Sequence, residues 1–341
     1  MPLFTTIDEI KKYAGITSGS EFDSIKPDIA DVEELHIAPI LGASLYASLL
    51  SAYETSAIVS GSLTEKLLFK CQKALINIAL EQYSALAQLN FSDSGIRQME
   101  DSSYKSPKQW QIDDLRDYFY MKGYRALDEL LTFLETNKAS FSSWASDTSA
   151  YTINKKFIVS DTNTFQGFYD IKGSRLTFIA LQPEMRIVEI MHIMPNISEG
   201  LFTRLKTKIK ENNVTGDLAE IMEMLQLAVT HFTIANAIDK KIITISQEGV
   251  FSRNYRSTMD NARERIKADV SDRQIAKDAC LKIAEKAMEN LRAYLNANAT
   301  AADATTPKFS EYYASPLYVA PTDGTKLQTY ENLSSDKIYV G

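Results

Sequence analysis

The chain has 341 residues, of which 45% are apolar and 24% are charged. This composition supplies enough apolar surface for a large core, arranged as two domains or as one elongated body. The formal net charge of -7 argues against sequence-independent binding of nucleic acid, because such affinity comes mostly from Lys and Arg contacts to phosphates.

The beginning of the chain, MPLFTTIDEIKKYAG, has no basic segment followed by an apolar one, as a secretory leader would have. No uninterrupted apolar run approaches the roughly 20 residues that are needed to span a bilayer. Cys71 and Cys280 each lie in an apolar helical pattern, with the spacing of neither a redox pair nor a zinc site. We therefore expect a cytoplasmic product with two buried free thiols and no membrane partner.

The first part of the chain predicts a series of helices. Thr6 and Glu9 have the spacing of a capping box, which opens a short first helix. The second helix should end at Pro39, because a proline disfavours helical geometry in the residue before it. A central helix over 63–89 is apolar around most of its circumference, and another helix runs from about 112 to 134.

The composition changes twice in the second part of the chain. Residues 141–180 are rich in Thr, Ser, Tyr, Phe and Val, which predicts two or three short strands. Helical periodicity returns over 181–297, and residues 298–341 show only isolated aromatic clusters. The predicted fold is mainly α: helical bundles at 1–140 and 181–297, a β-rich insert between them, and an extended C-terminal arm.

One motif occurs twice and contains two of the three histidines. Residues 27–39 read PDIADVEELHIAP and residues 183–195 read PEMRIVEIMHIMP, so P-x4-V-E-x-x-H-I-x-P recurs at an offset of 156 residues. With insertions between blocks, the register continues at offsets of 154 and 161 residues: NFSDSGI at 90–96 falls on TISQEGV at 244–250, and ALDELLTFL at 126–134 falls on AMENLRAYL at 287–295. Loop insertions produce such changes of offset while helical faces keep their phase. We interpret the pattern as a tandem duplication of one helical bundle.

The repeated motif has an alternative interpretation as a di-iron centre. Ferritin-like carboxylate proteins place Glu-x-x-His on each of two helices and one further Glu on each of two others, and the pairs Glu33 with His36 and Glu189 with His192 fit half of that set. Glu81 on the central helix could supply a third ligand, but its register partner in the second half is Ala235 or Asn236, so the fourth is missing. Each histidine also lies beside a proline at an expected helix end. There an imidazole can bind free carbonyls and pair with the preceding Glu, so we expect a structural role.

Other catalytic signatures are absent from the sequence. It contains no phosphate-binding glycine loop and no nucleophile elbow, and no cofactor is expected. His231 lies in the apolar stretch LQLAVTHFTIANAI and is expected to be a core histidine. The one basic cluster comprises Arg253, Arg256, Arg263, Arg265 and Lys267 and is expected to form a solvated helix face; a contact with DNA or an acidic partner is the alternative.

The C-terminal arm is too apolar for a tail that only solvates the chain. Its aromatic and aliphatic clusters are each too short to build a core, and such segments gain order by docking on another surface. The candidate partner-binding residues are Tyr312, Tyr313, Leu317, Tyr318, Val319, Ile338, Tyr339 and Val340.

A family resemblance supplies a functional expectation. The opening FTTIDEIKKYAGI and the segment HIAPILGASLYASLL are similar to the head-to-tail connector, or adaptor and head-completion, proteins of tailed bacteriophages. That likeness covers roughly the first 140 residues. With its PILGASLY and S-x-x-G-I signatures, most of the chain resembles an uncharacterised family carried by phages and prophages of Bacteroidetes.

The resemblance implies a virion protein rather than an enzyme. It would be assembled in the bacterial host cytoplasm as a homo-oligomeric ring beneath the portal protein, contacting tail and neck proteins, with DNA passing through its lumen. An acidic chain suits that task, because a channel in which DNA slides should not hold phosphates tightly. Two alternatives stay open: a di-iron enzyme, and another phage part such as a tail terminator.

Overall fold

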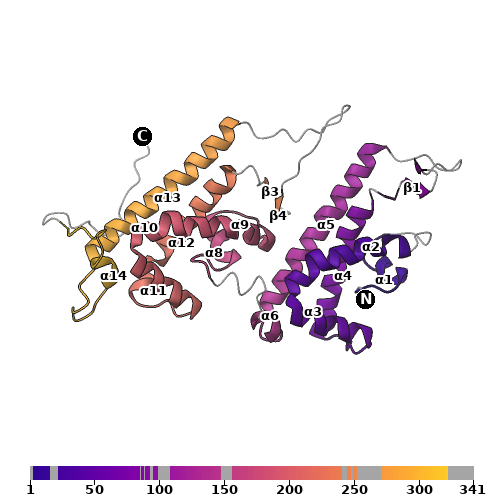
Figure 1. Ribbon diagram of the computed structural model, residues 1–341, viewed down its shortest axis with the longest axis horizontal. Coiled ribbons are helices and arrows are strands. Elements are labelled where there is room, and N and C mark those ends of the chain that lie inside the picture. Colours follow the sequence, from indigo (N-terminus) through magenta and orange to yellow (C-terminus); the bar gives the residue numbers. More distant parts are fainter. Residues whose placement is uncertain are drawn as a thin grey trace, which may run out of the picture.

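The computed structural model describes residues 3–15, 22–84, 86–87, 89–92, 95–98, 108–146, 156–239, 244–246, 249–251 and 270–321. These residues are mainly α-helical, as the sequence periodicity predicts. Figure 1 shows two helical bodies side by side, the earlier part of the chain at the right and the later part at the left. We call them the first unit (residues 3–146) and the second unit (residues 156–321).

The first unit contains a short opening helix, a long interrupted helix, a central helix and a long closing helix. The capping box at Thr6 is confirmed, since its side chain accepts a hydrogen bond from the Glu9 amide and the Glu9 carboxylate accepts one from the Thr6 amide. The elements are α1 (Ile7–Lys11), α2 (Phe22–Val32), the π-helix η1 (Glu33–Ile37), α3 (Ala38–Glu54), α4 (Leu63–Tyr83), β1 (Leu89–Ser92), β2 (Gly95–Gln98), α5 (Gln109–Thr136) and α6 (Ser142–Ser146).

The second unit presents corresponding elements in the same order. They are α8 (Thr162–Phe168), α9 (Arg175–Val188), the π-helix η2 (Glu189–Ile193), α10 (Met194–Ile197), α11 (Glu199–Lys210), α12 (Asp217–Asp239), β3 (Thr244–Ser246), β4 (Gly249–Phe251), α13 (Val270–Asn298) and α14 (Ser310–Tyr313). In each unit the two strands pair antiparallel in a hairpin, between the central helix and the long closing helix.

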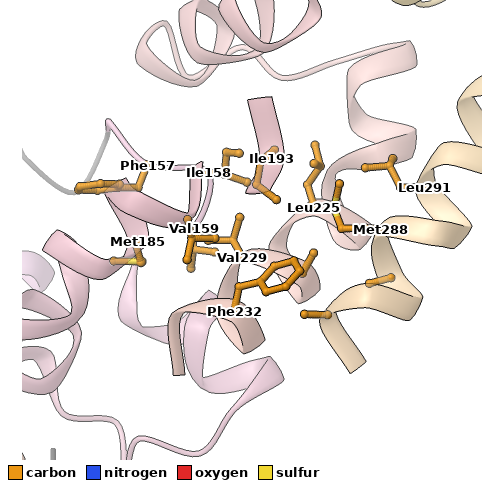
Figure 2. Packing of buried hydrophobic residues seen from close by; sticks show 14 of the residues in the cluster. Phe157, Ile158, Val159, Met185, Ile193, Leu225, Val229, Phe232, Met288 and Leu291 are labelled. Atoms are coloured by element: carbon orange, nitrogen blue, oxygen red, sulfur yellow. The ribbon is translucent and has the colours of Figure 1, made fainter. Parts of the chain in front are cut away.

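Each unit has a core of its own. The first core runs from Leu3 to Trp144 along the sequence and the second from Phe157 to Tyr312. Figure 2 shows the second core, in which side chains from α12 and α13 meet those of α9 and of the segment before α8. The boundary between the units therefore lies between residues 144 and 157, and the predicted boundaries at 140 and 181 are wrong.

The prediction of strands in 141–180 is also wrong for the residues that the structure describes there, which form α6, α8, the start of α9 and connecting turns. Polar residues at helix starts explain the error. Asp161 caps α8 and Ser174 caps α9, each accepting a hydrogen bond from the amide three residues on. Phe165 and Phe178 on these helices are fully buried, so the aromatic residues serve a helical core instead of a sheet.

The two prolines expected to end helices instead lie inside continuous ones. Pro39 is in the first turn of α3, and the π-helix η1 directly precedes it. In η1 the Ala38 amide binds the Glu33 carbonyl five residues earlier, and this wider turn accommodates a residue that has no amide of its own to donate. The second unit repeats the arrangement with η2 and the proline at the start of α10.

A short polar junction joins the units. Asp128 on α5 accepts hydrogen bonds from the Leu176 amide and the Ser174 hydroxyl, each at 2.9 Å, at the start of α9. Two turns further along α5, Glu135 accepts a hydrogen bond from Arg175 Nε at 2.9 Å. A carboxylate from the first unit thus caps the first turn of a helix in the second unit, where the exposed amides favour negative charge.

Two helical stretches, Phe22–Glu54 and Asp217–Ile238, are long and apolar enough to cross a membrane by length and composition. The second is the central helix of its unit and packs against α9 and α13. The first contains the buried Glu33 and is interrupted at Gly42, whose φ of 73° is not helical. The second stretch is therefore explained by the core of its unit, whereas only a minority of the first is buried.

Candidate functional site: a carboxylate clamp present in each unit

In the first unit, the glutamate of the repeated motif holds the N-terminal segment. Glu33 is 3% exposed, and its Oε2 accepts a hydrogen bond from the Leu3 amide at 2.8 Å. Its other oxygen accepts a hydrogen bond from the Tyr46 hydroxyl at 2.7 Å. Gln72 on α4 donates from Nε2 to the Leu3 carbonyl at 2.6 Å. Both polar groups of one residue, Leu3, are thus held by side chains of two different helices.

The second unit holds the equivalent segment in the same way. Glu189 is 3% exposed and accepts a hydrogen bond from the Ile158 amide at 2.5 Å. Gln226 on α12 donates from Nε2 to the Ile158 carbonyl at 3.3 Å. The second oxygen of Glu189 binds Lys206 Nζ at 2.5 Å. We call each arrangement of glutamate, glutamine and one clamped residue a carboxylate clamp.

Burial dominates the electrostatics of both clamps. It raises the pKa of Glu33, while the Leu3 amide and the Tyr46 hydroxyl act in the opposite direction. It also raises the pKa of Glu189, against the attraction of Lys206 and the bond from the Ile158 amide. Because the acceptor oxygens are engaged by protein donors, these carboxylates are built to hold a chain segment in place.

The two motif histidines have packing roles. The His36 ring meets Tyr124 edge to face at 6.0 Å, and the His192 ring stacks on Phe232 at 4.4 Å between centroids. Burial lowers the pKa of both imidazoles. The expected pairing of each histidine with the preceding glutamate is not what the structure shows, since each glutamate binds the clamped amide instead.

The di-iron alternative conflicts with the geometry of the two pairs. Residues flanking Glu33 and His36 pack in the first core, and those flanking Glu189 and His192 pack in the second. One dinuclear centre needs both pairs in a single bundle core. Among the residues that the structure describes, no group of three or more His, Cys, Asp or Glu side chains is arranged to hold a metal ion.

Each unit closes with an aromatic pair that follows its longest helix. In the first unit Phe141 and Trp144 are buried, and Trp144 Nε1 donates to the Ile40 carbonyl at 2.8 Å. In the second unit Phe309 and Tyr312 are fully buried. The sequences are FSSW and FSEY.

These pairs close over a backbone break that also recurs. Gly42 and Ser198, separated by the motif offset of 156 residues, have φ of 73° and 70°. The Ser198 hydroxyl donates to the Glu311 carbonyl at 3.4 Å, next to the buried Tyr312.

The predicted docking arm is therefore partly a component of the second unit. Tyr312 is fully buried, and its hydroxyl donates to Asn296 at 2.9 Å, so its assignment as a partner-binding residue is wrong. Leu317 and Tyr318 pack partly buried against the second core. Tyr313 is 38% exposed and Val319 is 64% exposed. The remaining candidates, Ile338, Tyr339 and Val340, lie outside the described residues.

Other sequence expectations have simple outcomes. Cys71 and Cys280 are buried free thiols, as predicted. His231 is 7% exposed in the core helix α12 and packs edge to face on Tyr169 at 6.0 Å, which agrees with a core histidine. The basic cluster, Arg253 to Lys267, lies outside the described residues.

An open groove of about 730 Å³ lies along the outer face of α13. Glu289, Arg292 and Asn296, on successive turns of the helix, line it together with Lys282 and Lys286. Phe232, on which His192 stacks, and Asn196, which accepts a hydrogen bond from Arg292, also line it. Sequence analysis did not indicate this groove, because its residues read as an ordinary solvated helix face.

A family model described as a family of unknown function (DUF6712) matches residues 37–152 and 193–318. The chain belongs to this family. The two DUF6712 segments begin at Ile37 and Ile193, the last residues of η1 and η2, and each extends past the closing aromatic pair of its unit. No curated protein and no solved structure matches the chain.

Proposed function

We propose that this DUF6712 protein is a structural subunit of a phage virion, a head-to-tail connector or adaptor that forms a homo-oligomeric ring docked to the portal protein around the DNA channel. The observation that carries the proposal is the use of buried polar groups. The buried Glu33, Glu189 and Gln72 and the partly buried Gln226 hold backbone segments in place, which supports a rigid scaffold.

Exposed apolar side chains support the proposal that the protein assembles with other subunits. Large apolar side chains are exposed on the N-terminal half of α5, which extends beyond the body of the first unit in Figure 1: Trp110, Leu115, Tyr118 and Met121. Exposed apolar groups of this kind are typical of contact surfaces. The net charge of -7 suits a channel through which DNA slides.

We further infer that the two units descend from one duplicated ancestor. The support is positional: the clamps, the π-helices, the backbone breaks, the hairpins and the closing aromatic pairs recur in one order. On this interpretation, the segment expected to be a β-rich insert is the N-terminal part of the second copy. Residues 322–341, with Ile338, Tyr339 and Val340, would then be the arm that contacts neighbouring subunits or the adjoining ring.

The location of the chain in a particle tests the function. Cryo-electron microscopy and mass spectrometry of particles purified from a host that carries the gene should find the chain between portal and tail. Its absence from particles, or iron bound in stoichiometric amount by the purified protein, would overturn the proposal. A position at the far end of the tail tube would instead identify a tail terminator.

A further inference from the structure

The face of α13 that forms the groove corresponds to a covered face in the first unit. The helices α5 and α13 align at an offset of 161 residues, because their buried positions then coincide: Ala126, Leu127, Leu130 and Leu134 with Ala287, Met288, Leu291 and Leu295. At this offset Asp128 corresponds to Glu289, Leu131 to Arg292 and Glu135 to Asn296.

The first set of positions is the junction face of α5. Asp128 and Glu135 bind the start of α9, and Leu131 lies between them on the same helical face and is 1% exposed. The second set lines the groove, where Arg292 is exposed in place of the buried leucine and donates to Asn196 Oδ1. Asn296 accepts hydrogen bonds from the Tyr312 hydroxyl and the Val319 amide. The same face thus binds the other unit in the first case, and in the second it forms a groove in which two of the three positions bind residues of their own chain.

The element that fills this face in the first unit also has a counterpart. It is the start of α9, the helix that leads into η2, and the helix in the same position of the first unit is α2, which leads into η1. At the motif offset of 156 residues, the junction residues Ser174 and Leu176 fall on Ser18 and Ser20, which lie outside the described residues. In the first described turns of α2, which follow directly, Asp23, Ser24 and Lys26 are exposed. In Figure 1, α13 lies at the left end of the long axis and the start of α2 at the right end, while α9 and α5 meet between them.

The charges of the four helices are complementary in pairs. The α5 helix carries six acidic and three basic side chains, and it binds α9, which has two basic and one acidic. The α13 helix carries five basic and four acidic side chains, whereas α2 has three acidic and one basic. The net charges of the two helices in each pair therefore have opposite signs, and the acidic helix is α5 in the first pair and α2 in the second.

We propose that the groove on α13 binds the start of α2 of a second copy of this chain, so that copies associate head to tail through a junction that repeats the one between the two units of a single chain. Such a heterologous contact produces a ring when the rotation closes and a filament when it does not. The inference deepens the homo-oligomeric assembly proposed above, and it requires no particular place in a virion.

Cross-linking of the full-length wild-type chain tests which occupant fills the groove. Equal amounts of unlabelled and nitrogen-15-labelled protein are mixed, treated with an amine-reactive linker and analysed by mass spectrometry. We expect Lys282 and Lys286 to link to Lys26 of a differently labelled copy. Links from these groove lysines only to Lys326 or Lys337 of the same chain would assign the groove to the C-terminal residues of its own chain and overturn the proposal.

Charge reversal tests the energetics. The variant Lys286→Glu/Arg292→Glu should raise the dissociation constant of self-association about tenfold or more, because like charges would then face α2. The control Lys208→Glu/Lys210→Glu makes the same change on α11 and should leave assembly unaltered, and Asp23→Lys in the groove variant should restore part of it. Light scattering and unfolding curves report assembly and folding separately.

Three results contradict the inference: a wild-type chain that stays monomeric at its solubility limit, a two-fold symmetric dimer that does not grow, or unchanged assembly in the groove variant. None of them bears on where the protein lies in a particle. Conversely, head-to-tail association by a protein that is absent from virions would leave the inference intact and remove the connector function.

Discussion

The two units hold their N-terminal segments with the same glutamate and glutamine, yet they differ in what neutralises the glutamate. Glu33 has a neutral partner, the Tyr46 hydroxyl, whereas Glu189 has the ammonium group of Lys206. The amide and carbonyl that are clamped are common to both units. Holding one backbone residue is therefore the shared requirement, and the group that neutralises the glutamate is free to vary.

The units also differ in what covers their longest helices. The first unit has the buried Leu131 at the position where the second has the exposed Arg292. The tryptophans allow the units to be observed separately, because Trp110 and Trp144 are the only two in the chain and both lie in the first unit. Tryptophan fluorescence therefore follows the first unit and circular dichroism follows both.

The largest expected effect is on the second unit, from truncation after Asn298. This change removes Phe309 and Tyr312, and burying one large aromatic side chain contributes about 3–5 kcal/mol. We expect the second unit to unfold at a much lower urea concentration, with the fluorescence transition of the first unit retained. Truncation after Pro321 is the matched control and should leave both transitions in place; equal behaviour of the two truncations would show that the closing aromatic pair is dispensable.

The next largest losses of stability should follow removal of the clamp glutamates, and the loss should differ between the two units. Glu189→Ala leaves Lys206 and the Ile158 amide without their carboxylate, which costs about 3–5 kcal/mol when a buried ion pair loses one member. Glu33→Ala leaves only neutral donors unsatisfied, which costs about 1–3 kcal/mol. In urea unfolding, the loss in Glu189→Ala should appear mainly in the circular dichroism. The loss in Glu33→Ala should appear in the tryptophan fluorescence, which follows the first unit. The exposed neighbour Glu34→Ala is the control, and a clamp variant that behaves like it would refute the clamp.

Removing the Asp128 carboxylate at the junction should lower stability less than removing a clamp glutamate. Asp128→Ala removes the acceptor of the Leu176 amide and the Ser174 hydroxyl, and loss of such a cap costs about 1–2 kcal/mol. Hydrogen exchange at the Leu176 amide should accelerate accordingly. Its counterpart Glu289→Ala, on the exposed face, should leave the stability of the monomer unchanged within about 0.5 kcal/mol. Equal effects in the two variants would contradict the difference between the two faces.

The smallest effect is a pH dependence at Glu33. Burial raises its pKa above the ordinary value of 4.5, so the folded state binds this proton more tightly than the unfolded state does. Stability from this group is present below 4.5 and is lost as the pH rises through the raised pKa. The wild type should therefore lose stability relative to Glu33→Gln as the pH rises, which unfolding followed by tryptophan fluorescence would measure. A gain in stability over the same pH range would mean that the pKa of Glu33 is lowered.

Much of the helical fold could be predicted from the sequence, because its determinants are local. The capping box at Thr6 and the apolar periodicity of α4 and α5 act within a few residues. The segment around Phe165 is helical and not the predicted strand, because β-propensity reflects packing context and Asp161 caps a helix there. The π-helices were not foreseen because Pro39 reads as a helix end.

The clamps could not be predicted, since they join residues 30 or more positions apart without local pattern. The motif identified the right glutamates, but their partners come from segments that no spacing rule connects to them. One sequence signal for the closing element of each unit was present: F-S-x followed by Trp or Tyr occurs at 141–144 and at 309–312. Because Phe309 and Tyr312 are buried, the predicted arm begins as part of the second unit.

The most direct test of the account is a cryo-electron microscopy structure of the assembly formed by the purified full-length chain. The account predicts that α2 of one copy lies on α13 of the next, with Glu289 and Arg292 at the contact, and that this pair of helices superposes on α9 and α5 within a chain. An assembly in which the groove on α13 faces solvent, or in which copies meet through two identical surfaces, would contradict it.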